Sequence, residues 1–304
     1  TPRTSSAASD VYKRQKHRRQ FNIPLIKMQG VQEKFIDMLF NTWLIQAGVS
    51  LTNDILDSGE KPAVISAIMK QQTTDRARIV LDNAMDIHAG SAICLGENNF
   101  LEKFYRSAPI GITVEGSNTL TRNLIIFGQG LNKSHPYIYP ILESVLENDL
   151  KKFEKGFNDI LGHSLGLYAK SFVPNFSSDI NSRLDKQISS FANLSNFVAL
   201  KGGAIKREQF LSADMADIFS NLYLAHAVRY YEENNNVSTF LTEYCINRLL
   251  NENQNIINRV VSNIGPLGVP LLHIKGKVKV ESYTERENLM NEMFNNEKII
   301  NSFR

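Results

Sequence analysis

The stretch TVEGSNTLTR, residues 113–122, contains the side chain best placed to do chemistry. Glu115 stands between a β-branched valine and a glycine, and small polar residues follow it. A carboxylate in a partly buried setting has a raised pKa and can act as a general base near working pH. The same carboxylate could instead stabilise the start of the next helix through the helix dipole, by about 0.3–1 kcal/mol. The pattern alone favours this second interpretation.

Two other stretches could contact a phosphate group. DIHAGSAICLG, residues 86–96, contains Gly90 and Gly96, and glycines let a backbone approach a ligand closely. The stretch is not G-x-G-x-x-G and lacks a βαβ context, so a glycine-terminated helix explains it more simply. The arginines of RRQF, residues 18–21, could bind phosphate, but alone they are only a basic cluster.

Other catalytic signatures are missing from the sequence. The six histidines show no metal-ligand spacing, and no P-loop, nucleophile elbow or outstanding carboxylate pair occurs. Cys94 and Cys245 lie far apart, which permits one disulfide but no disulfide framework and no zinc motif. A reducing compartment fits this cysteine usage best.

Composition indicates a globular protein, with 42% hydrophobic and 21% charged residues among 304. The net charge of +3 comes from the first 20 residues, where basic side chains greatly outnumber a single acid. The remainder is close to neutral, which is poor evidence for a nucleic-acid partner. No apolar run approaches the roughly 20 residues that span a bilayer.

Helical periodicity dominates the elements that would position these residues. The pattern predicts a helix over 29–57 and a second from Lys61-Pro62 to Ala89-Gly90, each long enough to belong to a bundle. A short helix NNFLEKFYR, an extended stretch IGITVEGS, and a helix from Asn118 that ends at Gly128 and Gly130 should follow. Amphipathic helices make up the chain beyond about residue 148, without a repeat.

The first 15 residues, TPRTSSAASDVYKRQ, have no apolar period. Their text resembles translated sequencing-adapter sequence, so we interpret residues 1–15 as a non-native tail. A natural disordered tail is the alternative. Both interpretations leave these residues out of the predicted fold.

Five stretches in order, RRQFNIPLIKMQGVQE, AMDIHAGSAICLG, FYRSAPIGITVEGSNTLTR, NLIIFGQG and SHPY, resemble the C-terminal half of acyl-CoA dehydrogenases. The likeness is strongest to the bacterial long-chain type known as FadE. The later stretch KGGAIKREQFLSADMADIFSNLYLAHAVRYY resembles the helical extension of that type. The resemblance covers roughly residues 17–235, and VEGSNTLTR is its most specific motif.

The resemblance implies an all-α fold, with the acyl-CoA dehydrogenase C-terminal four-helix bundle at 16–147 and an extra helical C-terminal domain at 148–304. The implied reaction is FAD-dependent α,β-dehydrogenation of a medium- or long-chain fatty acyl-CoA in β-oxidation. Glu115 matches the family's catalytic base. The implied FAD-binding residues, partly contributed across a dimer, are Arg18, Asp86, Ala89, Gly90, Ser117 and Thr119.

Further expectations come from the same likeness. A homo-oligomer, electron-transfer flavoprotein as electron acceptor, and a cytoplasmic enzyme with possible inner-membrane association in the full-length protein are implied. The family's N-terminal helical domain and middle β-domain are expected to lie outside this chain, which alone should bind FAD poorly and turn over little. Where the family reads Gln-Ile-x-Gly-Gly-x-Gly, this sequence has Asp86, Ala89 and Ala92 at three positions.

Two alternatives stay open. The substitutions at Ala89 and Ala92 would suit a non-catalytic helical protein that uses the bundle for oligomerisation or interaction. An acyl-CoA oxidase, which passes electrons to oxygen, is compatible with the same motifs.

Overall fold

The computed structural model describes residues 11–131, 137–173, 177, 179–296 and 299. Within them the chain is almost wholly helical, as predicted, and its one sheet is a two-stranded antiparallel ribbon of β1 (Arg19–Gln20) and β2 (Ile23–Pro24). The 3₁₀ turn η1 (Leu25–Lys27) leads from this ribbon into the first long helix.

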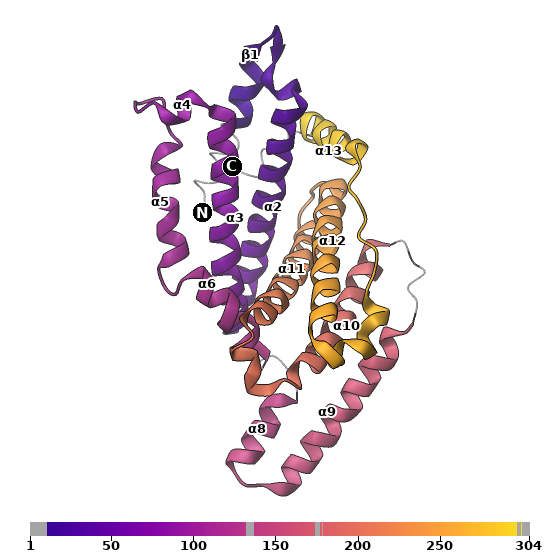
Figure 1. Cartoon of the computed structure of the whole chain (residues 1–304). Helices are drawn as coiled ribbons and strands as arrows, with labels where there is room; N and C mark the ends of the chain where they lie inside the picture. Colours follow the sequence, from indigo (N-terminus) through magenta and orange to yellow (C-terminus); the bar gives the residue numbers. More distant parts are fainter. Residues whose placement is uncertain (1–10, 132–136, 174–176, 178, 297–298, 300–304) are drawn as a thin grey trace.

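The two long helices predicted from periodicity are confirmed. Helix α2 spans Gln29–Asp57 and α3 spans Ala63–His88, with Pro62 at the N-cap of α3. A proline at a helix start loses no hydrogen bond, because the first N–H groups have no intrahelical partner. The short helix α4 (Gly90–Ile93) and helix α5 (Glu102–Thr113) then return the chain along α3, and Figure 1 shows α5, α3 and α2 side by side.

Two local predictions are wrong. The stretch IGIT at 110–113 is the last turn of α5 and not an extended segment, whereas Val114 and Ser117 have extended backbone. The helix that begins at Asn118 does not end at Gly128 or Gly130. It runs from α6 (Asn118–Leu120) through the π-helix η2 (Thr121–Gln129) and remains helical through residue 131.

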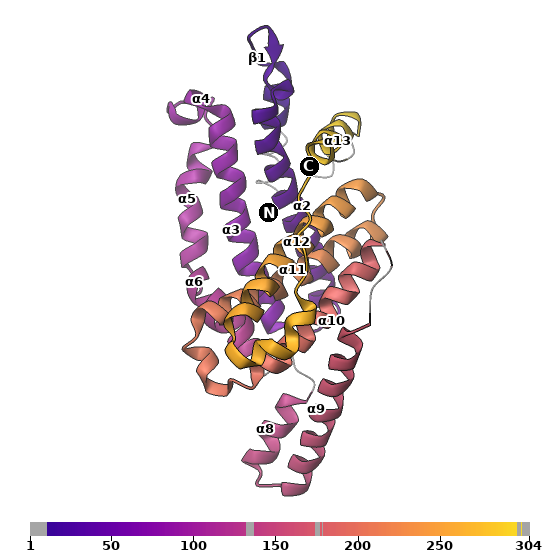
Figure 2. The same cartoon turned by 45° about the vertical axis from the view of Figure 1, so that its right-hand side comes forward.

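The second half of the chain adds further helices, which Figures 1 and 2 show from two directions. Helices α8 and α9 form a hairpin that extends away from the rest, whereas α11 and α12 lie beside α2. The elements are α8 (Ile138–Leu146), α9 (Leu150–Ser171), α10 (Ile180–Ala199), η3 (Gly202–Lys206), α11 (Gln209–Asn234), α12 (Thr239–Asn263), η4 (Gly265–Ile274) and α13 (Tyr283–Asn295).

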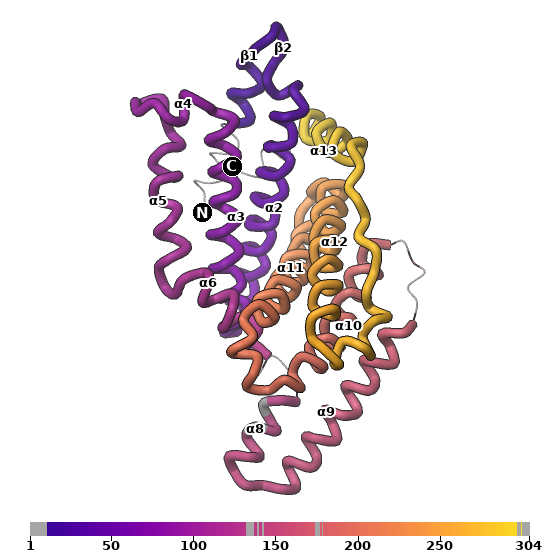
Figure 3. Tube along the Cα trace, in the orientation of Figure 1, coloured from indigo at the N-terminus to yellow at the C-terminus, as the bar shows by residue number. Residues whose placement is uncertain are grey.

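One hydrophobic core joins the two halves. Trp43 and Leu44 of α2, Ile126 of η2, Ile218 of α11 and Leu249 of α12 are all fully buried in the same cluster. The tube in Figure 3 shows α11 running alongside α2, although the two are far apart in sequence. The core therefore continues across the boundary predicted between residues 147 and 148.

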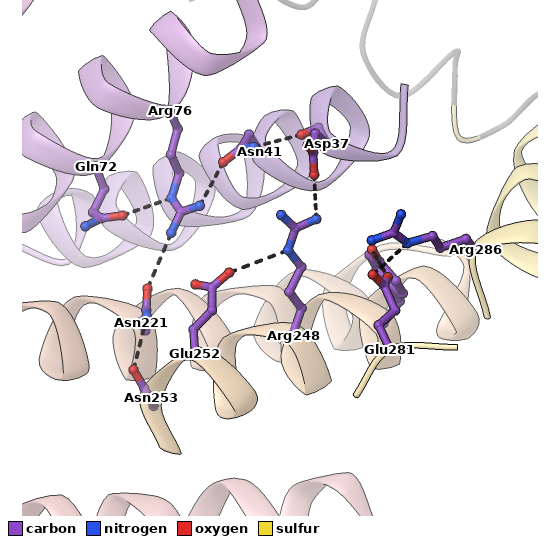
Figure 4. Close-up of polar contacts among 11 residues, drawn as sticks. Asp37, Asn41, Gln72, Arg76, Asn221, Arg248, Glu252, Asn253, Glu281 and Arg286 are labelled. Carbon is purple, nitrogen blue, oxygen red and sulfur yellow. Dashed lines mark hydrogen bonds and ion pairs between the residues drawn. The ribbon is translucent and has the colours of Figure 1, made fainter. Parts of the chain in front are cut away.

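A buried arginine crosses this contact (Figure 4). Arg76 of α3 donates to Gln72 Oε1 at 2.9 Å, to Asn41 Oδ1 of α2 at 2.8 Å and to Asn221 Oδ1 of α11 at 3.4 Å. Asn221 donates in turn to Asn253 of α12 at 3.0 Å. Burial lowers the pKa of the Arg76 guanidinium, and the three amide oxygens compensate for its lost hydration.

The residues before β1 also contribute to the core. Residues 11–17 are helical, and Val11, Tyr12 and Gln15 are buried. Tyr12 packs edge-on against Phe35 of α2, with ring centroids 6.1 Å apart. Residues 11–15 thus pack with the helices in this structure, whereas residues 1–10 lie outside the described part. The prediction that residues 1–15 are non-native remains a prediction.

Candidate functional site

The loop between α5 and α6 holds Glu115 in an unusual backbone conformation. Its φ is +56°, in the left-handed region that side chains other than asparagine and aspartate seldom adopt, and Gly116 follows at +91°. Two successive residues of this kind make a sharp turn immediately before the next helix. Such outliers cost of order 1–3 kcal/mol and persist where the surroundings impose them.

A polar network on α3 fixes this turn. Lys70 Nζ donates to Gly116 O and to Asn118 Oδ1, each at 2.6 Å. The buried Asn118 donates from Nδ2 to Asp75 Oδ1 at 2.7 Å and to Thr74 Oγ1 at 2.8 Å. The turn and the start of α6 are therefore tied to one face of α3.

The side chain of Ser117 caps the helix that follows. Ser117 is the N-cap of α6, and its hydroxyl accepts from Leu120 N at 3.3 Å. Glu115, Ser117 and Thr119 are all exposed. Glu115 therefore projects from a turn with fixed geometry, and the dry surroundings that a general base requires must come from groups that cover this face.

The other predicted cofactor residues gather at the C-terminal end of α3. Asp86 accepts an ion pair from Lys34 of α2 at 2.8 Å. Arg14, one turn before Arg18, lies with its Nη1 2.9 Å from Nδ1 of the buried His88. Arg18 N donates to Arg14 O, so the exposed Arg18 lies at the same end of α3.

The backbone at this end turns through Ala89, which ends α3 and begins α4. Ala89 has φ +50° and ψ −134°, a conformation that glycine adopts far more easily than alanine. A Cβ at Gly90 would meet nothing within 4 Å, so the loop backbone is open to a ligand. Asn99 Nδ2 donates to Ala92 O at 2.7 Å and so links the two ends of the loop that follows Ala89.

The structure thus brings the predicted site residues together in two groups and not in one. Lys70, which holds the Glu115 turn, and Ala89 are 19 positions apart on α3 and its C-cap. At a rise of 1.5 Å per residue, the two groups lie roughly 28 Å apart. Within one chain the two groups therefore do not form one compact pocket.

The donor sets suit the two parts of a flavin dinucleotide. Arg18 is exposed at the end of α3 where the backbone at Gly90 is open, and a guanidinium suits a pyrophosphate. Ser117 and Thr119 offer exposed hydroxyls next to the Glu115 turn. Asp86 fits less directly, because its carboxylate is already paired with Lys34.

The pattern analysis missed the residues that support the site. Lys70, Asp75 and Asn118 form the network beneath the turn, and no local motif indicates that they meet. Arg122, the last residue of VEGSNTLTR, was also missed. Its guanidinium donates from Nε to Oδ1 of Asp217 in α11 at 2.7 Å and from Nη2 to Oδ2 at 2.5 Å. This pair fixes η2 to the second half of the chain.

Two kinds of feature are absent from the part of the chain that the structure describes. No group of three or more His, Cys, Asp or Glu side chains there could hold a metal ion. No helix in that part is both long and apolar enough to cross a membrane.

Comparisons with known proteins define the class. Residues 4–128 match the family described as acyl-CoA dehydrogenase, C-terminal domain, and residues 132–274 match acyl-CoA dehydrogenase, C-terminal, bacterial type. A crystal structure of acyl-CoA dehydrogenase complexed with FAD from Bacillus anthracis superposes with a TM-score of 0.73 at 17% identity, over 99% of this chain and 53% of that one. The chain belongs to the acyl-CoA dehydrogenase family and contains C-terminal domains of that family.

Two further relatives have different activities by name. Acryloyl-CoA reductase (NADH) of Anaerotignum propionicum is 30% identical over 106 residues, which are 35% of this chain and 26% of that protein. The structure of acyl-CoA oxidase 3 from Yarrowia lipolytica matches with a TM-score of 0.50 at 17% identity, over 99% of this chain and 44% of that one. The chain therefore spans about half or less of the length of these relatives.

Proposed function

We propose that this chain is the C-terminal part of a FAD-dependent acyl-CoA dehydrogenase of the FadE type. The substrate is a medium- or long-chain fatty acyl-CoA, and the reaction is the α,β-dehydrogenation step of fatty-acid β-oxidation. The turn at Glu115 carries this proposal. It presents a carboxylate at a fixed position, on a loop tied to α3 through Lys70 and Asn118.

Glu115 takes up the α-proton of the thioester on its carboxylate. The neighbouring carbonyl makes that proton acidic, and a carboxylate held at the α-carbon in a dry pocket is basic enough to remove it. Bound FAD supplies the redox chemistry by accepting the hydride from the β-carbon. Arg18, Ala89 and Gly90 of one copy hold the pyrophosphate side of the cofactor, and Ser117 and Thr119 of the partner copy hold its adenine side.

The remaining parts of the proposal follow from this chemistry. The enzyme is a homo-oligomer, as the family resemblance implies, and FAD would lie between residues of two copies. Electron-transfer flavoprotein would be the electron acceptor, and the enzyme works in the bacterial cytoplasm, where the full-length protein associates with the inner membrane.

The test is anaerobic reduction of the flavin by acyl-CoA, in the protein of which this chain is the C-terminal part. Glu115→Gln keeps the size and polarity of the side chain but removes the base. We expect flavin bleaching to slow by at least about 100-fold while the flavin content stays unchanged. Glu154→Gln, at an exposed position on α9, is the matched control and should bleach normally.

Normal bleaching by Glu115→Gln would contradict the assigned base. If neither the unaltered protein nor Glu115→Gln contains flavin, the alternative of a non-catalytic helical protein would be supported instead. Rapid reoxidation by oxygen in place of the flavoprotein acceptor would favour an acyl-CoA oxidase.

A further inference from the structure

A basic cleft lies far from the proposed site, between α10, α12 and the segment that follows η4. Its volume is about 380 Å³, within the range of small-molecule pockets. One face of α10 provides Arg183, Lys186 and Ser190, which recur at helical spacing. Lys277 closes the opposite side. These residues belong to the second half of the chain, to which the dehydrogenation assigns no role.

The charged side chains that line this cleft are all positive. Arg183, Lys186 and Lys277 line it, and none of its described lining residues is acidic. Among the described residues, none of these three cations forms an ion pair. Three cations line one cleft without a carboxylate, so an anion bound there would be attracted by all three.

A second cleft, on the α2 side of α12, shows the contrasting arrangement. Its volume is about 420 Å³, and each of its three cations has a carboxylate partner. Arg248 pairs with Asp37 at 2.8 Å and Arg286 with Glu281 at 2.8 Å, as Figure 4 shows, and Lys279 pairs with Glu285 at 2.6 Å. The unpaired cations of the first cleft are therefore not a general feature of this helical extension.

The cations of the basic cleft are held in place by neutral groups. Lys186 Nζ donates to two backbone carbonyls, Ser171 O and Val173 O, each at 2.7 Å, which leaves one N–H free. Arg183 donates from Nη1 to the amide oxygen of Asn247 and keeps its other N–H groups for a ligand. Desolvation lowers the pKa of Lys186, as expected for an ammonium without a counter-charge.

A fixed histidine stands at the same wall. The ring of His273 stacks on Phe172 with centroids 3.9 Å apart, and its Nδ1 lies 2.9 Å from Pro270 O. Its Nε2 lies 2.6 Å from Ser171 Oγ. These contacts fix the orientation of the His273 ring at the side of the cleft where Ser171 O also accepts from Lys186.

We propose that this cleft binds a phosphate-bearing small molecule. An arginine fork and two ammonium groups match a compact dianion, because Arg contacts phosphate oxygens in pairs and Lys adds point charges. The volume exceeds what a free inorganic anion needs and leaves room for an attached organic group. The site is separate from the residues proposed to hold FAD, and it does not depend on their assignment.

The experiment is calorimetric titration of the full chain with ADP, inorganic phosphate and adenosine. We expect ADP to bind, inorganic phosphate to compete with it, and adenosine to bind at least about tenfold more weakly, since the phosphates supply the recognition. Arg183→Gln should weaken ADP binding at least about tenfold, and Lys277→Gln, at an exposed position, about threefold.

Two control variants locate the binding. Lys279→Gln removes a cation from the other cleft, and Lys206→Gln removes an exposed cation of η3, and both should leave ADP affinity unchanged. Because Arg183 also bonds Asn247, its substitution could affect folding, and circular dichroism of each variant checks this. If Arg183→Gln does not fold, Lys277→Gln tests the cleft in its place. No ADP binding by the unaltered chain, equal affinity for adenosine, or ADP binding that survives both Arg183→Gln and Lys277→Gln would overturn the proposal.

Discussion

Two residues at the proposed site hold positive φ without being glycine, namely Glu115 and Ala89. At Glu115 the strain has a function in the proposed reaction, because it sets the direction in which the side chain leaves a turn whose next residue, Gly116, is held by Lys70 of α3. At Ala89 no hydrogen bond of the side chain offsets the strain, since a methyl group makes none. The sequence resemblance marks position 89 as one where the family has glycine, and the observed φ of +50° explains that preference.

Ala89→Gly should therefore stabilise the chain. Glycine relieves the unfavourable conformation, and this gain exceeds the added flexibility of the unfolded chain, so we expect the free energy of unfolding to rise by about 1 kcal/mol. Urea unfolding followed by circular dichroism measures it. Ala169→Gly in helix α9 is the control and should lose about 1 kcal/mol. Equal losses in both variants would show that Ala89 is not strained.

At the scale of residues, the sequence indicated side chains on the turn but not the side chains that support it. The resemblance indicated Glu115 and Ser117, and the structure places Ser117 at the N-cap of α6. The supporting residues Lys70 and Asp75 come from a helix more than 40 positions earlier. Their side chains meet the turn only through packing, so no local pattern could have indicated them.

At the scale of elements, helix ends were predictable where the chain itself provides a stop. The ends of α2 and α3 follow from Gly59, Pro62 and Gly90. The error at α5 has the opposite cause. Its β-branched residues and Pro109 favour extended backbone, but Gly111 lets α5 pack closely on α3, with a Cβ there lying 3.2 Å from Thr74. Tertiary packing overrides local preference in this helix.

The end of α3 should make stability depend on pH. Burial, and then the nearby Arg14 and Arg18, lower the pKa of His88 from 6.5 to about 4. Between these values the unfolded state binds more protons than the folded state, so stability falls as pH falls from 6.5 to about 4. The full shift corresponds to about 3 kcal/mol.

Urea midpoints near neutral pH and at about pH 4.5 test this linkage. Because carboxylates also titrate in that range, the comparison is between variants. His88→Leu cannot bind a proton, so its stability should decline less with falling pH than that of the unaltered chain. His17→Gln, at an exposed position, should keep the original slope. An unchanged slope in His88→Leu would contradict the role of His88.

At the scale of the whole molecule, the all-α architecture was predictable from periodicity and resemblance, but its unity was not. The predicted boundary at residue 147 separates a bundle from an extension. In the structure, Arg122 of η2 binds Asp217 of α11, and Arg76 of α3 reaches Asn221 of the same helix. Both contacts cross the boundary, and neither arginine lies in a pattern that indicates a distant partner.

A continuous core predicts that both halves unfold together. The single tryptophan, Trp43, is fully buried in α2 and monitors the first half. Cys245 is fully buried in α12 and monitors the second half, and burial raises its thiol pKa, so it should react with a thiol reagent only after unfolding. In a Cys94→Ser background, which removes the exposed cysteine, tryptophan fluorescence and Cys245 labelling should give the same urea midpoint.

Arg122→Gln should lower both midpoints together, because it removes a contact between the halves. Two separate midpoints, or a shift of only one of them in Arg122→Gln, would show that the halves fold as independent domains.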